Sequence, residues 1–259
     1  MQSNHCRLTL AWAVKEGLDC HLVLEERVKG SYKKEASGNN FLFELMGVKS
    51  IEVVPGGTDM MAAMEKKAEA LKAEGRHPYI IPGGASNATG ALGYASCAAE
   101  TMAQLNDMHL DIHHLVVPSG SAGTHAGMVV GMTAMETGIP VSGMNVSREK
   151  RVQEEIVYKL AKETAAKLGV KKEIPRDTVV CFDQYVGPGY SIPTDSMVEA
   201  VKLFAQTEAV LLDPVYSGKT AAGLVDLVRN GYFASGANVL FLHTGGSPAL
   251  YAYMDSFRK

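Results

Sequence analysis

The chain has 259 residues, of which 46% are hydrophobic and 20% charged, and its formal net charge is −3. A chain of this length can bury one large core or two smaller ones. The near-neutral balance without a basic block argues against a nucleic-acid-binding protein. The apolar runs are too short to cross a bilayer, and we expect no signal peptide. The four cysteines form no C-x-x-C pair, which predicts reduced thiols and a cytoplasmic protein.

Short apolar segments alternate with amphipathic segments along the whole chain. The predicted strands are residues 20–26, 50–55, 79–84, 114–120, 140–146, 178–183, 209–214 and 238–245. Most of them are apolar on both faces, as is typical of buried parallel strands. Helices are predicted over residues 59–75, 88–108, 149–169, 194–209 and 219–231, with Thr194 as an N-cap.

This alternation predicts an α/β protein with two lobes, each with a mostly parallel sheet flanked by helices. Eight strands would also suit a β/α barrel, but the uneven segment lengths and the irregular insert at residues 27–48 favour open sheets. We expect a smaller α/β lobe at residues 1–98 and a larger α/β lobe at residues 99–259. The seam should lie near residues 88–110.

The stretch "SGSAGTHAG" follows the apolar run "HHLVVP" and opens a predicted helix at Thr124. Glycines allow backbone N–H groups to converge, and the helix N-terminus adds its positive end. Hydroxyls of Ser121 and Thr124 would add donors, so a phosphate fits better than a carboxylate. The stretch is neither G-x-G-x-x-G nor a P-loop, which argues against a dinucleotide and ATP. An ordinary glycine-rich turn is the alternative.

Three further stretches place polar groups near predicted strand or helix ends. In "QSNH", Ser3 or Asn4 would cap a helix whose N–H groups could hold a carboxylate, with plain capping as the alternative. Tyr190 and Tyr216 lie in the loops "GPGYSIP" and "DPVYSGK", and partly buried structural tyrosines are the alternative. Thr244 ends the last predicted strand. The histidines near Asp111 fit no zinc spacing, so we expect no metal.

Five motifs together resemble one family of pyridoxal-phosphate enzymes. They are "QSNHCR", "PGGASNATGALGY", "SGSAGTHAGMVVG", "DPVYSGKTAAGL" and "HTGGSPALYAY", in the order of that family and over nearly the full chain. The chain resembles the D-cysteine desulfhydrase and 1-aminocyclopropane-1-carboxylate (ACC) deaminase group, which has the tryptophan-synthase-β fold (fold type II). The resemblance implies two α/β lobes with pyridoxal 5'-phosphate between them.

The resemblance also implies a role for each site residue. The cofactor phosphate would be held by Ser119, Gly120, Ser121, Ala122, Gly123 and Thr124. Ser3 and His5 would bind the substrate carboxylate, and Asn4 would lie beside the cofactor ring while also contacting substrate. Tyr190 and Tyr216 would flank the substrate, which makes them catalytic candidates together with Ser3. Ser217 or Thr244 would meet the pyridine nitrogen.

Two positions depart from the family pattern. The deaminase branch has a glutamate where this chain has Ser217, and a hydroxyl partner leaves the ring nitrogen closer to neutral. That favours β-elimination over ring opening. The family's Schiff-base lysine lies upstream of "QSNH", whereas this sequence starts at Met1, and Lys219 is expected only to start a helix. We therefore expect an impaired enzyme.

These observations predict β-elimination on a small amino acid, with D-cysteine giving pyruvate, ammonia and sulfide. ACC deaminase and L-cysteate sulfo-lyase activities are the alternatives, and a non-catalytic module that binds a phosphorylated ligand is the alternative of another class. We expect a small amino-acid substrate, neither nucleic acid nor membrane as partner, and a homodimer that covers apolar surface.

Overall fold

The computed structural model describes residues 2–258, which divide into two compact units. Unit 1 contains the residues up to Ala85 together with Pro248–Ala252, and unit 2 contains Ser86–Ser247 and the residues from Tyr253 onward. Helix α4 (Ala88–Asp107) lies entirely in unit 2, although the expected boundary at residue 98 would divide it.

Unit 1 is built on a parallel pair of strands, β1 (His21–Glu26) and β2 (Ser50–Pro55), with His21 opposite Ser50. Its helices are α1 (Asn4–Lys15), α2 (Asn39–Leu45), α3 (Met60–Ala73) and the short 3-10 turn η1 (Gly83–Ala85). Parallel strands need a crossover connection, and α2 lies within it. The buried core of the unit is formed by Leu10, Cys20, Leu22, Leu24 and Phe43.

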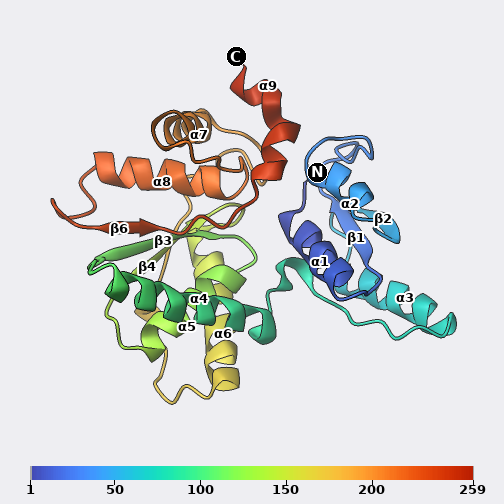
Figure 1. The fold of residues 1–259 in the computed structure, drawn as a ribbon, viewed down its shortest axis with the longest axis horizontal. Coiled ribbons are helices and arrows are strands. Elements are labelled where there is room, and N and C mark those ends of the chain that lie inside the picture. Colours follow the sequence, from blue (N-terminus) through green and yellow to red (C-terminus); the bar gives the residue numbers. More distant parts are fainter. Residues whose placement is uncertain (1, 259) are drawn as a thin grey trace. The chain divides into compact units, whose positions relative to one another are not determined.

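Unit 2 is built on a four-stranded parallel sheet in the order β5-β4-β3-β6. The strands are β3 (His114–Ser119), β4 (Val141–Asn145), β5 (Val179–Phe182) and β6 (Val239–Phe241). The helices are α4, α5 (Gly123–Ala134), α6 (Lys150–Leu168), α7 (Asp195–Glu208), α8 (Ser217–Arg229) and α9 (Met254–Phe257), with the 3-10 turn η2 (Arg176–Thr178). A further 3-10 turn, η3 (Ser247–Tyr253), lies mostly in unit 1. Helices α4, α5 and α6 cover one face of the sheet, and α7 and α8 lie on the other (Figure 1).

The α/β class with parallel sheets is confirmed, but two predicted strands are wrong. Residues 79–82 and 209–213 have no regular secondary structure, Gly83 and Gly84 belong to η1, and neither segment pairs with a strand among residues 2–258. In the first segment Pro82 has no N–H to give to a ladder, and Tyr79 is 79% exposed. In the second, the carboxylate of Asp213 binds backbone N–H groups of the next residues, which turns the chain into α8.

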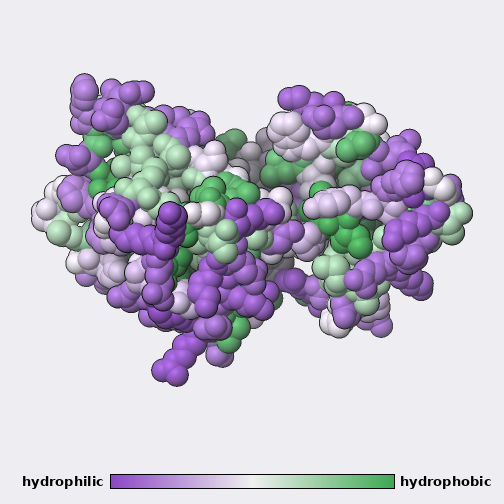
Figure 2. Space-filling view, turned by 90° about the horizontal axis from the view of Figure 1, so that it is seen from below, coloured by the Kyte–Doolittle hydropathy of each residue, from purple (hydrophilic) through white to green (hydrophobic). Residues whose placement is uncertain are grey.

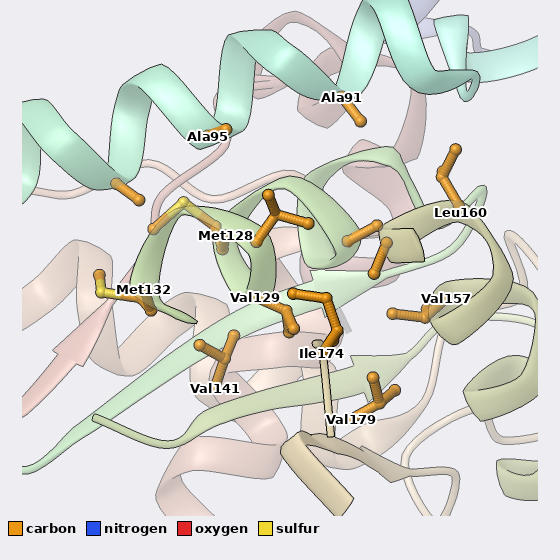
Figure 3. Packing of buried hydrophobic residues seen from close by; sticks show 14 of the residues in the cluster. Ala91, Ala95, Met128, Val129, Met132, Val141, Val157, Leu160, Ile174 and Val179 are labelled. Carbon is orange, nitrogen blue, oxygen red and sulfur yellow. The ribbon is translucent and has the colours of Figure 1, made fainter. Parts of the chain in front are cut away.

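The core of unit 2 depends on a close approach of α4 to α5. Ala91 and Ala95 of α4 lie over α5 near Met128, and Val141 and Val179 enter the same core from the sheet (Figure 3). The contact is close because α5 presents glycines to α4. A Cβ on Gly131 would lie 2.9 Å from the backbone oxygen of Ala95.

The surface mixes apolar and polar side chains. On the face shown in Figure 2, hydrophobic residues are interspersed with hydrophilic ones in each unit. Within residues 2–258, no helix combines the length and the hydropathy needed to cross a membrane.

Two glycine-to-alanine substitutions test the close packing of α4 on α5. Both Gly131 and Gly93 lie inside helices, where replacing glycine with alanine stabilises the helix by up to about 1 kcal/mol through helix propensity. Gly93 has open space around its Cβ position, so Gly93→Ala should raise the free energy of unfolding. Gly131→Ala should instead lower it by about 1–2 kcal/mol, because overpacking outweighs the helix propensity. Urea unfolding of both variants measures this, and equal stabilisation of the two would contradict the packing described.

Candidate functional site

The predicted phosphate loop forms an open cluster of hydrogen-bond donors. It connects the end of β3 at Ser119 to the start of α5 at Gly123. Ala122 has a φ of 82°, a left-handed conformation that non-glycine residues rarely adopt and that often marks functional sites. The backbone N–H groups of Ser121, Ala122 and Thr124 meet no acceptor within residues 2–258. The loop therefore has the geometry of an anion-binding nest at a helix N-terminus.

The base of the loop is fixed by buried polar side chains. The Ser119 hydroxyl is buried, accepts a hydrogen bond from Gln153 Nε2 (2.9 Å) and lies 3.1 Å from His125 Nδ1. Gln153 also donates to the carbonyl of Gly120 (3.1 Å), which receives a second hydrogen bond from Arg148 (2.6 Å). The side chain of Ser119 thus supports the loop from within. Sequence reasoning missed Gln153 and Arg148, since nothing in their local pattern connects them to this loop.

A serine from a distant segment lies at the open side of the loop. Ser86 Oγ accepts the N–H of Gly123 (3.2 Å) and donates to Ser121 Oγ (2.7 Å). Ser86 belongs to the motif "PGGASNATGALGY", which contributed to the family resemblance but for which we predicted no binding role.

The two predicted tyrosines meet each other beside the loop. The hydroxyls of Tyr190 and Tyr216 are in direct hydrogen-bond contact, and their rings form an edge-to-face pair with centroids 6.0 Å apart. A Cβ on Gly120 would lie 3.3 Å from the ring of Tyr216, so the ring packs tightly against the loop at this glycine. The structure therefore brings both tyrosines to the predicted phosphate site.

The hydroxyl of Ser217 is already engaged within the protein. It donates to Asp213 Oδ1 (2.8 Å) and accepts the N–H of Asp213 (2.8 Å), and the residue is fully buried. The Asp213 carboxylate also accepts N–H groups of Val215, Tyr216 and Ser217 at the start of α8. Burial raises the pKa of Asp213, and these hydrogen bonds oppose that rise.

Thr244, the other candidate for the ring nitrogen, is placed differently. It is half-buried and its hydroxyl has no hydrogen-bond partner within residues 2–258. It follows β6, which runs parallel to β3 with Phe241 opposite Val116. Because parallel strands end at the same edge of a sheet, Thr244 and the phosphate loop lie at the same edge.

Lys219 is the only buried lysine among residues 2–258. Its Nζ donates to the carbonyls of Val186 (2.6 Å) and Gly189 (2.9 Å), in the loop that leads to Tyr190. Burial lowers its pKa to about 8. Beyond starting α8, as expected, this lysine ties the tyrosine loop to the helix.

The "QSNH" stretch lies in unit 1 and begins α1. Ser3 is the N-cap, since its Oγ accepts the N–H of Cys6 (3.2 Å), which confirms the capping prediction. Asn4 Oδ1 accepts a hydrogen bond from Asn39 (2.7 Å), and burial lowers the pKa of His5. The N–H groups of Asn4 and His5 have no acceptor within residues 2–258, so two donors remain at this helix N-terminus.

Residues 1–245 match the family described as "Pyridoxal-phosphate dependent enzyme". The chain belongs to this family. A solved structure described as an ACC deaminase homologue is 35% identical with a TM-score of 0.86, over 98% of this chain and 74% of the other. A threonine deaminase from T.th. is 19% identical with a TM-score of 0.57, over 95% of this chain and 75% of the other. A serine racemase from Dictyostelium discoideum is 14% identical with a TM-score of 0.58, over 94% of this chain and 74% of the other. The last two show the fold alone.

Membership establishes a pyridoxal-phosphate enzyme of fold type II with pyridoxal phosphate as cofactor, and the 35% identical ACC deaminase homologue supports a lyase or deaminase family. The residues of unit 2 fit the phosphate of this cofactor. Three N–H groups of the loop have no acceptor in the described part of the chain, and the hydroxyls of Ser121 and Thr124 lie on the same stretch. A phosphate dianion can accept this many hydrogen bonds, whereas an empty nest leaves polar groups unsatisfied.

The buried His125 under the loop makes the stability of the cofactor-free protein depend on pH. Burial lowers its pKa from 6.5 to about 4, so the unfolded chain takes up the proton first as the pH falls. The contribution of the neutral His125 to the free energy of unfolding is therefore fully present above pH 6.5 and is lost as the pH falls towards 4. At about 1.4 kcal/mol per pKa unit, this contribution is on the order of 3 kcal/mol.

Urea unfolding across this pH range should show a shallower acid loss for His125→Gln than for the wild type. His77→Gln, at an exposed position, is the matched control and should keep the wild-type slope. An unchanged slope in His125→Gln would show that other groups cause the acid loss.

Proposed function

We propose that the chain descends from a pyridoxal-phosphate enzyme that catalyses β-elimination on D-cysteine, with pyruvate, ammonia and sulfide as products. The observation that carries this proposal is the open donor cluster at the end of β3, in a chain of the pyridoxal-phosphate family. The relative described as an ACC deaminase homologue supports a small amino acid as substrate.

In this proposal the phosphate is held by the stretch from Ser119 to Thr124. Backbone N–H groups of Ser121, Ala122 and Thr124 donate to its oxygens, and the dipole of α5 adds favourable charge. Ser119 and Gly120 contribute through the loop backbone, since the Ser119 hydroxyl is buried and Gly120 lies under the Tyr216 ring. Gly123 supplies the first helical residue of α5.

At the ring nitrogen we favour Thr244 over Ser217. Ser217 is fully buried, and its hydroxyl donates its one hydrogen bond to Asp213. The hydroxyl of Thr244 has no hydrogen-bond partner among residues 2–258 and can donate to a ligand. A threonine can donate to a neutral ring nitrogen but cannot keep it protonated as a carboxylate does. This supports the β-elimination branch over ACC deaminase, which remains the alternative activity together with L-cysteate sulfo-lyase.

The substrate carboxylate would be bound by the start of α1. The N–H groups of Asn4 and His5, which have no acceptor among residues 2–258, match the two oxygens of a carboxylate, and Ser3 keeps its hydroxyl hydrogen while capping the helix. The lowered pKa of His5 leaves its imidazole neutral near pH 7, able to donate or accept one hydrogen bond. Asn4 would also lie beside the ring.

The bound cofactor supplies the electron sink that the elimination needs. Tyr190 and Tyr216 would flank the substrate, and their hydroxyls, which are hydrogen-bonded to each other, could pass a proton between them. The carbonyl contacts of Lys219 hold the segment that carries Tyr190.

We further propose that residues 1–259 alone have weak activity. Lys219, the only buried lysine within residues 2–258, donates hydrogen bonds to two backbone carbonyls, so its amine is held by the protein and is not offered to a cofactor aldehyde or a substrate proton. A positioned general base typically contributes about 10²–10⁴-fold to the rate. A module that only binds the cofactor is the second candidate, because the donor cluster is complete without a reactive lysine.

The proposal includes a homodimer in the cytoplasm. The four cysteines are unpaired. Leu8 and Trp12 lie one turn apart on α1 with 47% and 60% exposure, so an apolar strip of this helix is left for another chain to cover. Size-exclusion chromatography that shows a strict monomer would contradict the dimer.

Charge reversal at the loop tests the phosphate site. In Ser121→Asp a carboxylate would face the cofactor phosphate, and repulsion should weaken binding of pyridoxal 5'-phosphate at least about 10-fold, or roughly 1.4 kcal/mol. Ser196→Asp, at the exposed first turn of α7, adds the same charge away from the site and should bind as the wild type does. Fluorescence titration measures both, and equal affinities would contradict the assignment.

Product analysis tests the substrate and the impairment together. With cofactor present, D-cysteine should release pyruvate and sulfide, about 10²–10⁴-fold more slowly than a family member with a positioned general base does. ACC and L-cysteate should release less oxo acid than D-cysteine. Faster turnover of ACC would assign the deaminase branch, and a rate typical of such a family member would contradict the impairment.

A further inference from the structure

Ser86 approaches the phosphate loop from a different part of the chain. It is 35 residues before Ser121 in sequence, yet its Oγ lies 2.7 Å from Ser121 Oγ and 3.2 Å from the N of Gly123. The contact also explains the glycine at position 123, since a Cβ there would lie 2.9 Å from Ser86 Oγ. The hydroxyl is therefore part of the same donor cluster as the loop.

The position of Ser86 is fixed by the helix that follows it. Asn87 caps α4 by accepting the N–H of Gly90 (2.9 Å), and Ala91 and Ala95 of α4 pack closely on α5. Because α5 begins at Gly123, the packing of α4 on α5 also sets the distance from Ser86 to the loop. The hydroxyl is thus held by the scaffold and needs no movement of the chain to reach the loop.

We propose that Ser86 is a phosphate-binding residue of this enzyme. This inference rests on the proposed function of the loop. A serine hydroxyl has one hydrogen and two lone pairs. One lone pair holds the N–H of Gly123, while the hydrogen now points to Ser121 Oγ and can turn to a phosphate oxygen bound between Ser121 and Thr124.

This role gives Ser86 two effects on the cofactor. It adds one hydrogen bond to a charged oxygen, and it keeps Gly123 at the geometry in which α5 points its N-terminus at the phosphate. Both effects depend on the phosphate. Loss of the hydroxyl should therefore weaken the binding of ligands that carry a phosphate and leave the binding of other ligands unchanged.

The test uses pyridoxine 5'-phosphate, which has no aldehyde and cannot react with lysines, and pyridoxine as the ligand without phosphate. Isothermal titration calorimetry of residues 1–259 should show that Ser86→Ala lowers the affinity for pyridoxine 5'-phosphate about 10-fold. The affinity of the variant for pyridoxine, which binds weakly to the wild type, should not change. Ser96→Ala, at an exposed position on α4, is the matched control and should bind both ligands as the wild type does.

Each other outcome has a defined meaning. If Ser86→Ala binds pyridoxine 5'-phosphate as well as or better than the wild type, the inference is overturned while the proposed function stands. An equal loss for both ligands also overturns it, because the serine would then act on the fold alone. If the wild type shows no preference for the phosphorylated ligand, both the inference and the proposed function of the loop fail.

Discussion

The site depends on a set of backbone N–H groups that find no acceptor in the part of the chain that the structure describes. They lie where β3, between β4 and β6 in the sheet, passes into α5. Unpaired donors are unfavourable unless an anion or water satisfies them, and the left-handed Ala122 adds local strain. The rest of unit 2 holds this arrangement in place through the close contact of α4 with α5 and the polar support from Gln153 beneath the loop.

The polar residues around the site fall into two groups according to how their hydrogen-bonding capacity is used. Ser119, Ser217 and Lys219 are buried, and their polar atoms are bound to other parts of the protein. Ser121 and Thr244 keep capacity that a ligand can use. On this basis we propose that the first group supports the scaffold and the second binds the cofactor, although both groups stand in similar glycine-rich motifs.

The sequence predicted much of the fold, because buried parallel strands and capped amphipathic helices leave strong local patterns. Thr194 and Ser3 cap helices as expected. The segments at 79–84 and 209–214 have the composition of strands, but pairing depends on partners that no local pattern encodes. For the same reason the inward turn of the Ser119 hydroxyl and the approach of Ser86 to the loop could not be predicted. Both are set by tertiary packing between distant segments.

The central claim is that the loop from Ser121 to Thr124 binds the phosphate of the cofactor through its backbone. Amide NMR of the protein titrated with pyridoxal 5'-phosphate measures this directly. We predict large downfield shifts of the N–H signals of Ser121, Ala122 and Thr124, because each gains a charged acceptor. Signals of these three amides that stay in place while the cofactor binds elsewhere would contradict the account.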